Sequence, residues 1–259
     1  MFKSTWDIIQ NKILQLAEFD RQFAVFGADH HRYSFRPVII AENLDDYERQ
    51  HGFKLPEELR YVYEHIGNGG VGPFYGLRPL DECLLMQPGL SYPGESYYRA
   101  KKDAGEFQFD PNMSEETILQ MDDPLQRMGV ICIIDQGCGQ DIGMVTAGDL
   151  SGSIIYSFSE GHFQDTNQSL ADIYLAWLDR EMKLFQYLEN MVRVSSSWPE
   201  IRDRFESQVE RIDTEAYLRS LLDIPRTRKT FFGTMKPLTV EEYVKNMMQN
   251  SSRKWWRFW

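Results

Sequence analysis

The first 66 residues predict three helices, two of them from apolar positions at helical spacing. The first stretch predicts a helix near the start of the chain. Its repeating positions are Trp6, Ile9, Ile13, Leu14, Leu16 and Ala17. A second helix is predicted over about 41–50, with Gly52 as its C-terminal cap residue. A third is predicted from Pro56, whose fixed φ suits a first helical position, and Gly67 can end it in the left-handed conformation. Its apolar positions are Leu59, Val62, Tyr63 and Ile66.

Three short runs in the middle of the chain have the pattern of β-strands. They read "GVICIID", "IGMVTA" and "GSIIYSF", and the turn sequences "QGCGQD" and "GDLS" separate them. Runs rich in β-branched and aromatic residues, joined by short glycine-containing turns, are typical of an antiparallel meander. We therefore expect three consecutive antiparallel strands.

Helical spacing returns after these strands. Ser169 and Asp172 are spaced as a capping box for a long helix. One stripe of that helix holds Leu170, Tyr174, Trp177, Leu184, Leu188 and Met191, and Glu181 interrupts it. Further helices are predicted after "SSSWP", and Thr239 with Glu242 caps the last of them.

Residues 91–123 are polar and lie between the third predicted helix and the strands. From Glu95 to Asp123 this stretch holds eight acidic residues against three cations. We interpret it as a surface insertion with one short helix at about 115–120.

Composition and charge indicate a folded chain with a protein partner. The 259 residues are 42% hydrophobic and 26% charged, which is typical of a globular protein. The net charge is −11, but the stretch from Pro225 onwards has eight Lys or Arg against two Glu, a net +6 that leaves −17 for the residues before it. Because so acidic a body repels phosphate backbones and attracts cations, we expect no direct nucleic-acid binding and favour a basic protein partner.

The chain shows no membrane-spanning pattern, and its cysteines indicate a reducing compartment. No apolar run approaches the roughly 18 residues that cross a bilayer. The three cysteines, Cys83, Cys132 and Cys138, lack paired metal-ligand spacing. We expect a cytoplasmic protein without membrane contact, metal or cofactor.

The stretch "GNGGVGPFYGLRPL", from Gly67 to Leu80, holds five glycines and invites comparison with a phosphate-binding loop. Such a loop follows a strand and ends in Gly-Lys-Ser or Gly-Lys-Thr. This stretch follows a predicted helix, lacks that ending and has Arg78 as its only nearby cation. We interpret it as a helix end and tight turn that feed a strand.

No catalytic group can be assembled from motifs. Cys138 lies on a predicted turn between Asp135 and Asp141, which favour the neutral thiol over a nucleophile. The histidines show no metal-ligand motif, and adjacent carboxylates such as Glu57 and Glu58 are read as a solvated face. An enzyme is therefore not expected. Asp135 or Asp141 buried in a pocket beside His162 would reopen that alternative, and an open, solvated hairpin would end it.

The last seven residues, "RKWWRFW", combine cations with aromatic rings. Such a segment can stack on bases, enter a membrane interface or dock on an acidic protein surface. Packing against the acidic body of the same chain is the simplest interpretation, because the two parts have opposite charges.

The order of these elements resembles the SUKH superfamily of Smi/Knr-type proteins, which includes fungal cell-wall regulators and many bacterial immunity proteins. The resemblance covers roughly Trp6 to Asp179 and is strongest over 53–80. The matching positions are Leu55, Pro56, Asn68, Gly69, Gly70, Gly76, Leu77, Pro79, Leu80 and Gly137 to Gly139. The insertion at 91–123 and the residues after about Ser195 lie outside the usual domain.

The resemblance implies an α+β fold with a mixed or antiparallel sheet, helices packed around it and no catalytic residues. We expect a SUKH-like domain over residues 1–195 and a helical C-terminal extension over 196–259. The implied function is that of an immunity protein that neutralises a cognate toxin, such as a nuclease delivered by neighbouring bacteria.

The contact surface on such a toxin is predicted to be acidic. The candidate toxin-binding residues are Glu106, Asp110, Glu115, Glu116, Asp135 and Asp141. The alternative is an intracellular scaffold or regulator of endogenous proteins, whose working part would be the C-terminal extension. Deleting the residues after Arg228 would separate the two, since only the second function requires them. The sequence indicates no oligomeric state.

Overall fold

The structure is a computed structural model that describes residues 2–104, 128–158, 162–195, 197–207, 213–224, 228–230, 233–235 and 239–249. Contacts between residues divide the chain into two compact units. The first comprises Met1–Asn11 and Phe26–Trp177, and the second comprises Lys12–Val25 and Leu178–Trp259. Two long helices, α1 (Phe2–Phe19) and α7 (Leu170–Val194), contribute residues to both units.

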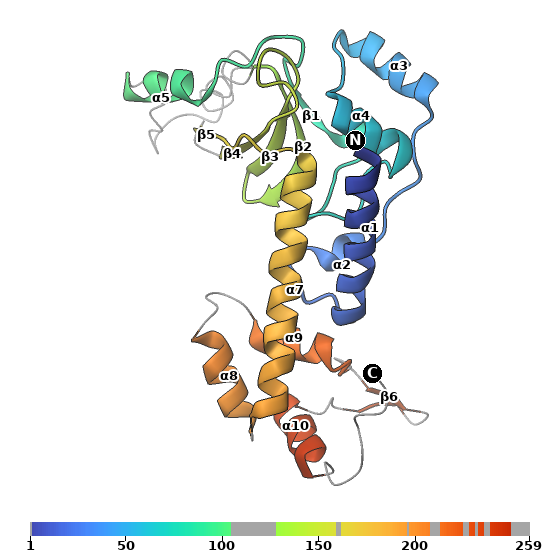
Figure 1. Cartoon of the computed structure of the whole chain (residues 1–259), viewed down its shortest axis with the longest axis vertical. Coiled ribbons are helices and arrows are strands. Elements are labelled where there is room, and N and C mark those ends of the chain that lie inside the picture. The colour runs from blue at the N-terminus through green and yellow to red at the C-terminus, as the bar shows by residue number, and fades with distance from the viewer. Residues whose placement is uncertain are drawn as a thin grey trace. The chain divides into compact units, whose positions relative to one another are not determined.

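A five-stranded antiparallel sheet forms the centre of the first unit, with its strands in sequence order (Figure 1). The strands are β1 (Leu84–Met86), β2 (Val130–Gly137), β3 (Gln140–Val145), β4 (Ile154–Phe158) and β5 (His162–Asp165). The three predicted strands are confirmed as β2, β3 and β4, and β1 and β5 extend the meander at its two ends. The fold is α+β, as expected, because helices pack around this sheet.

The described helices of the first unit are α1, α2 (Ala28–His31), α3 (Ala41–His51), α4 (Glu57–His65) and α5 (Glu95–Asp103), with a 3-10 turn at Leu80–Glu82. Of these, α1, α3 and α4 were predicted from the sequence. Trp6 and Ile9 of α1 are fully buried, and so are Leu59, Val62 and Tyr63 of α4. Gly52 ends α3 with φ 71°, as predicted. Pro56 is the N-cap of α4 and not its first helical residue.

Glu58 contradicts the reading of Glu57 and Glu58 as a solvated face, because its side chain lies in the core with the residue 6% exposed. Its carboxylate accepts hydrogen bonds from the Leu170 and Ala171 N–H groups, at 2.9 and 3.1 Å, and from Trp6 Nε1 at 3.3 Å. Those two N–H groups belong to the first turn of α7, where a helix lacks internal acceptors. Glu58 therefore ties α4 to the start of α7.

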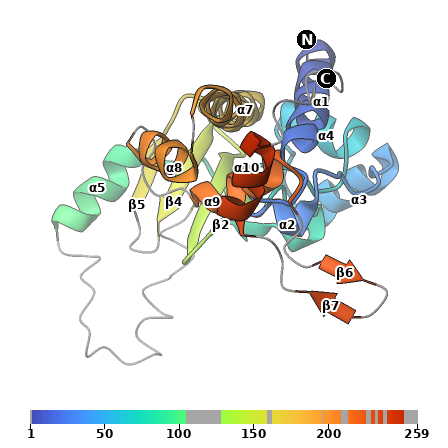
Figure 2. The same cartoon turned by 90° about the horizontal axis from the view of Figure 1, so that it is seen from below.

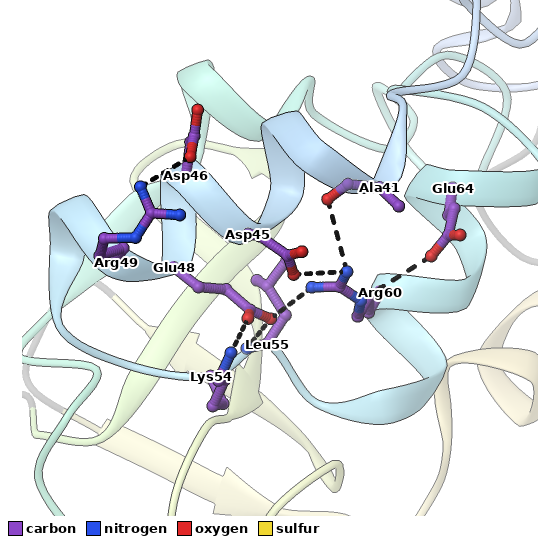
Figure 3. A network of polar contacts seen from close by, with 9 residues as sticks. All are labelled: Ala41, Asp45, Asp46, Glu48, Arg49, Lys54, Leu55, Arg60 and Glu64. Atoms are coloured by element: carbon purple, nitrogen blue, oxygen red, sulfur yellow. Dashed lines mark hydrogen bonds and ion pairs between the residues drawn. The ribbon is translucent and has the colours of Figure 1, made fainter.

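A second buried carboxylate, Glu48, joins α3 to α4 (Figure 3). It accepts from Lys54 Nζ at 2.6 Å and from the Leu55 N–H at 3.1 Å, and it lies 3.1 Å from Arg60 Nη1. Arg60 also binds Asp45 at 2.8 Å, whereas Asp46 and Arg49 form a separate exposed pair. We call Asp45, Glu48, Lys54 and Arg60 the α3–α4 network. Its partners explain how a carboxylate with a 2% exposed side chain can stay buried.

The glycine-rich stretch has the structural role predicted for it. The N–H groups of residues 67–71 all donate to main-chain carbonyls of the protein, so they do not converge on an anion. Gly70 bridges both Phe35 and Leu77, and Leu77 bridges Ile134 of β2. The left-handed conformation falls on Gly69 and Gly70, with φ 84° and 111°, and not on Gly67 as expected. The stretch thus connects the end of α4 to the sheet.

Helix α5 was not predicted, and it lies within the stretch read as a surface insertion. Tyr98 of this helix is 2% exposed and packs with Tyr92 against Phe163 of β5. The main-chain N–H of Glu95 donates to Asp165 at 3.1 Å. The first part of this stretch is therefore packed on the sheet. The short helix predicted at about 115–120 lies outside the described residues.

The second unit contains the C-terminal helices α8 (Trp198–Glu206), α9 (Thr214–Leu221) and α10 (Val240–Gln249). Both predicted capping boxes are confirmed by hydrogen bonds between Ser169 and Asp172 and between Thr239 and Glu242. Strands β6 (Arg228–Thr230) and β7 (Gly233–Met235) form a separate antiparallel pair (Figure 2).

Glu181 does not interrupt the buried stripe of α7 but belongs to it. The residue is 2% exposed and accepts a hydrogen bond from the hydroxyl of Tyr217 on α9 at 2.6 Å. Burial and the neighbouring Glu181 raise the pKa of Tyr217 well above its ordinary value, so this hydroxyl remains a donor. The pair connects α7 and α9 within the second unit.

Candidate binding site beside the β2–β3 hairpin

The β2–β3 hairpin places Asp135 and Asp141 directly opposite each other. Its turn has positive φ at three successive residues, Gly137, Cys138 and Gly139. The Asp135 carboxylate accepts from the Gly137 N–H at 2.6 Å, which fixes its position at the start of the turn. Two of the six candidate contact residues are therefore neighbours in space.

Arg78, from the glycine-rich stretch, lies between these two carboxylates. Its N–H donates to the carbonyl of Ile133 at 2.8 Å, which aligns it with β2. Its Nη2 is 2.8 Å from Asp141 Oδ1 and 3.5 Å from Asp135 Oδ2. The Asp141 side chain is 11% exposed, whereas that of Asp135 is 47% exposed. Asp141 thus anchors the guanidinium, and Asp135 remains accessible from outside.

A pocket of about 410 Å³ opens beside this ion pair. We call it the Arg78 pocket. Its charged and imidazole-bearing lining residues are His30, His31, Arg36, Arg78, Glu82 and Asp135. Arg36 and Glu82 form an exposed ion pair at 3.1 Å. The pocket is therefore polar, with cations and carboxylates that already pair with each other.

Aromatic side chains stand beside the Arg78 pocket. We call Phe26, His30, Phe74 and Tyr75 the aromatic rim. The Tyr75 ring lies 5.1 Å from that of Phe26 and 4.9 Å from that of His30, between centroids. Phe26 is 56% exposed and Tyr75 is 37% exposed. The sequence pattern did not predict this cluster, although Tyr75 in "GPFYG" is an aromatic residue between turn-forming residues, which is a signal for an exposed ring.

His31 and Cys83, two other groups that could react, are buried and make contacts within the protein. His31 is buried, accepts from the Tyr33 N–H at 3.1 Å through Nδ1, and packs edge-on against Trp177. Burial raises the pKa of the Cys83 thiol to about 12, although its hydrogen bond with Tyr63 and nearby Arg78 act in the opposite direction. Cys83 therefore stays a neutral thiol. Within the described ranges, no group of three or more His, Cys, Asp or Glu side chains could hold a metal ion.

Several predicted site residues lie outside the described part of the chain. They are Glu106, Asp110, Glu115 and Glu116. The "RKWWRFW" tail also lies outside it, and so does the side chain of His162. The predicted contact with a toxin stays a prediction for all six candidate residues.

The fold and the comparison with known protein families indicate the same class of protein. Residues 39–180, more than half of the chain, match the SMI1 / KNR4 family (SUKH-1). The chain belongs to this family, and its α+β architecture is the one expected for it. No curated protein and no solved structure matches the chain significantly. Among the helices of the described residues, none is long and apolar enough to cross a membrane.

Proposed function

We propose that this chain is an immunity protein that binds a cognate protein toxin and blocks it by occlusion. The family match over residues 39–180 carries the proposal, because many bacterial members of the SUKH superfamily are immunity proteins. A fold-level argument of this kind supports a function by analogy, so the surface must provide the physical reason for binding.

Charge supplies that reason. A toxin that acts on nucleic acid needs cationic residues to hold phosphate groups, and an acidic protein can cover the same residues. Residues before Pro225 carry a net charge of −17, because the whole chain has −11 and the remainder has eight cations against two Glu. Complementary charge also accelerates association. We place the contact on the acidic residues at 106–116 and on Asp135 and Asp141 of the β2–β3 hairpin.

Occlusion needs shape and charge but no reacting group. The polar groups at the hairpin fit this requirement, since Asp141 is held by Arg78 while Asp135 remains half exposed. The protein would act in the compartment where the toxin acts, which we propose is the cytoplasm. The proposed partner is a protein, with no direct contact to nucleic acid or membrane.

Co-expression with candidate toxins tests the proposal. Each toxin domain encoded beside this gene is induced alone and together with the chain, and growth and co-purification are measured. We expect the chain to restore growth and to co-purify with one toxin. Failure with every neighbouring toxin would contradict the function.

A charge-neutralised variant tests the acidic surface within the same experiment. It carries Glu106→Gln, Asp110→Asn, Glu115→Gln and Glu116→Gln, and it keeps the size of each side chain. We expect a slower association rate that depends less on salt than that of the unmodified chain. An unchanged association rate with unchanged salt dependence would show that this segment is not part of the contact surface.

A further inference from the structure

We propose that the aromatic rim and the Arg78 pocket are the central contact surface for a protein partner, which inserts a cationic side chain between Tyr75 and Asp135. The inference rests on the proposed function for the identity of that partner. The inference specifies where on the molecule the partner binds and the chemical class of the side chain that it inserts there.

Exposure of the aromatic rim is the first reason. Phe26 and Tyr75 are 56% and 37% exposed, and their rings touch at 5.1 Å between centroids. Single exposed apolar side chains are common, but neighbouring exposed aromatic rings beside a pocket are typical of interaction sites. Aromatic residues, tyrosine in particular, are enriched among the residues that dominate binding energy.

The rim is also held in place before any partner arrives. The Tyr75 N–H donates to the carbonyl of Asp135 at 3.3 Å. A Cβ atom added at Gly137 would lie 3.1 Å from Tyr75 Cε2, so the ring rests directly on the hairpin. At Gly27 an added Cβ would lie 1.7 Å from the Phe74 carbonyl oxygen, so these two main chains are in close contact. Such prior ordering lowers the entropy cost of binding.

The charges of the pocket select a cation. Arg36, Arg78, Glu82 and Asp135 line the pocket. Arg78 lies 2.8 Å from Asp141, outside the lining, but 3.5 Å from Asp135, so Asp135 is its less closely paired carboxylate. The accessible carboxylates are those of Glu82 and Asp135, whose side chains are 57% and 47% exposed. A guanidinium or ammonium group can rest on the Tyr75 ring and approach Asp135 at the same time. A basic partner is also the one that the acidic body attracts.

A short peptide tests the chemistry without any toxin. The probes are acetyl-Gly-Arg-Gly-amide and its Gln counterpart, titrated into the full chain and followed by the amide NMR signals of residues 74–78 and 135. A cation–π contact at an exposed site predicts a Kd about two- to fivefold lower for the Arg peptide. Equal binding of the two peptides would overturn the proposed cation site.

Variants assign that preference to named groups. Tyr75→Ala and Asp135→Asn should each abolish the preference for the Arg peptide, and Tyr75→Phe should keep it because the ring remains. The controls are Ile40→Ala, at a side chain that is 60% exposed elsewhere in the same unit, and Asp149→Asn on an exposed turn. Melting curves confirm that each variant is folded. A preference that survives Tyr75→Ala would overturn the assignment.

The toxin of the proposed function provides the second arm. Tyr75→Ala should weaken binding to it at least about tenfold, as expected for a central aromatic contact. Neutralisation equal to that of the unmodified chain would overturn the inference and leave the proposed function standing. Selective binding of the Arg peptide without any toxin partner would reject the proposed function and support the surface. Self-association abolished by Tyr75→Ala would instead assign the surface to a second copy and overturn the inference.

Discussion

Two clusters of arginine and carboxylate side chains lie in the first unit, and their surroundings differ. In the α3–α4 network the Glu48 side chain is 2% exposed and is bound by Lys54, Arg60 and the Leu55 N–H (Figure 3). At the β2–β3 hairpin Asp135 is 47% exposed beside a pocket of about 410 Å³ and an exposed tyrosine. Arginine and carboxylate side chains therefore occur once around a buried carboxylate and once beside a half-exposed one.

The difference separates a role in stability from a role in binding. A carboxylate whose acceptor positions are filled inside the protein has little left to offer a partner, and its loss leaves buried donors unsatisfied. A half-exposed carboxylate contributes little to folding but remains available to a cation from outside. The two clusters should consequently respond to substitution in opposite ways.

The largest effect is expected from Gly70→Val in the wall of the Arg78 pocket. An added Cβ would lie 2.3 Å from the Ser34 carbonyl oxygen, and φ is 111°. We expect the free energy of unfolding to fall by about 3–5 kcal/mol, measured by denaturant titration. The control is Gly52→Val, which has positive φ but nothing within 4 Å of its added Cβ, so only backbone strain of about 1–2 kcal/mol applies. Equal losses in the two variants would show that the close packing at Gly70 is unimportant.

The next effect is expected from Glu48→Ala in the α3–α4 network. Removing this buried partner of Lys54 and Arg60 should lower the free energy of unfolding by about 2–4 kcal/mol. Asp46→Ala in the same helix removes an exposed pair with Arg49 and should change stability by less than about 0.5 kcal/mol. Thermal and denaturant melts measure both. A loss after Glu48→Ala as small as that after Asp46→Ala would contradict the proposed role of the network.

Glu48 and Glu58, two of the buried glutamates, should give opposite pH dependence. Burial tends to raise the pKa of Glu48, but hydrogen bonds from Lys54, Leu55 and Arg60 outweigh it and hold that pKa below its ordinary 4.5. For Glu58 burial is the larger effect and its pKa is raised above 4.5, despite hydrogen bonds from Leu170, Ala171 and Trp6. Stability from Glu48 is therefore present above pH 4.5 and is lost as the pH falls below it. Stability associated with protonated Glu58 is present below pH 4.5 and is lost as the pH rises above it.

Comparison of Glu48→Gln and Glu58→Gln with the unmodified chain measures these contributions. Denaturant unfolding between about pH 3 and pH 7 should show that Glu48→Gln removes part of the loss of stability in acid. Glu58→Gln should remove part of the loss of stability that occurs as the pH rises above 4.5, the ordinary pKa of Glu58. Parallel pH profiles for all three proteins would contradict both assignments.

The smallest effect is expected at the tip of the hairpin. Cys138 is exposed, and replacement by serine removes only its thiol. Cys138→Ser should change stability by less than about 0.5 kcal/mol and should leave growth rescue intact. Loss of rescue at unchanged stability would mean that this thiol takes part in function.

The elements that sequence analysis predicted correctly are those with local signals. Strands β2 to β4 have β-branched runs between turn residues, and both capping boxes have fixed spacing. The buried positions of Glu58 and Glu181 were missed because each has a hydrogen-bond partner far along the chain. Glu58, for example, caps a helix that begins 112 residues later. Helix α5 was missed because its polar composition concealed Tyr98, which faces the sheet.

The candidate site was predictable only in part, for the same reason. The register of β2 and β3 pairs Asp135 with Asp141, which the short turn between them indicates. The contact of Arg78 with the Asp135 and Asp141 carboxylates depends on the path of the glycine-rich stretch. The aromatic rim joins Phe26 to Tyr75 across nearly fifty residues, and no local pattern marks that contact.

Calorimetric titration of the cognate toxin into two variants tests the separation of binding from stability most directly. The variants are Tyr75→Ala at the aromatic rim and Glu48→Gln in the α3–α4 network, compared at a temperature where both are folded. We predict that Tyr75→Ala raises the Kd at least about tenfold and that Glu48→Gln leaves it unchanged. An unchanged Kd for Tyr75→Ala, or an equal rise in both variants, would contradict the account.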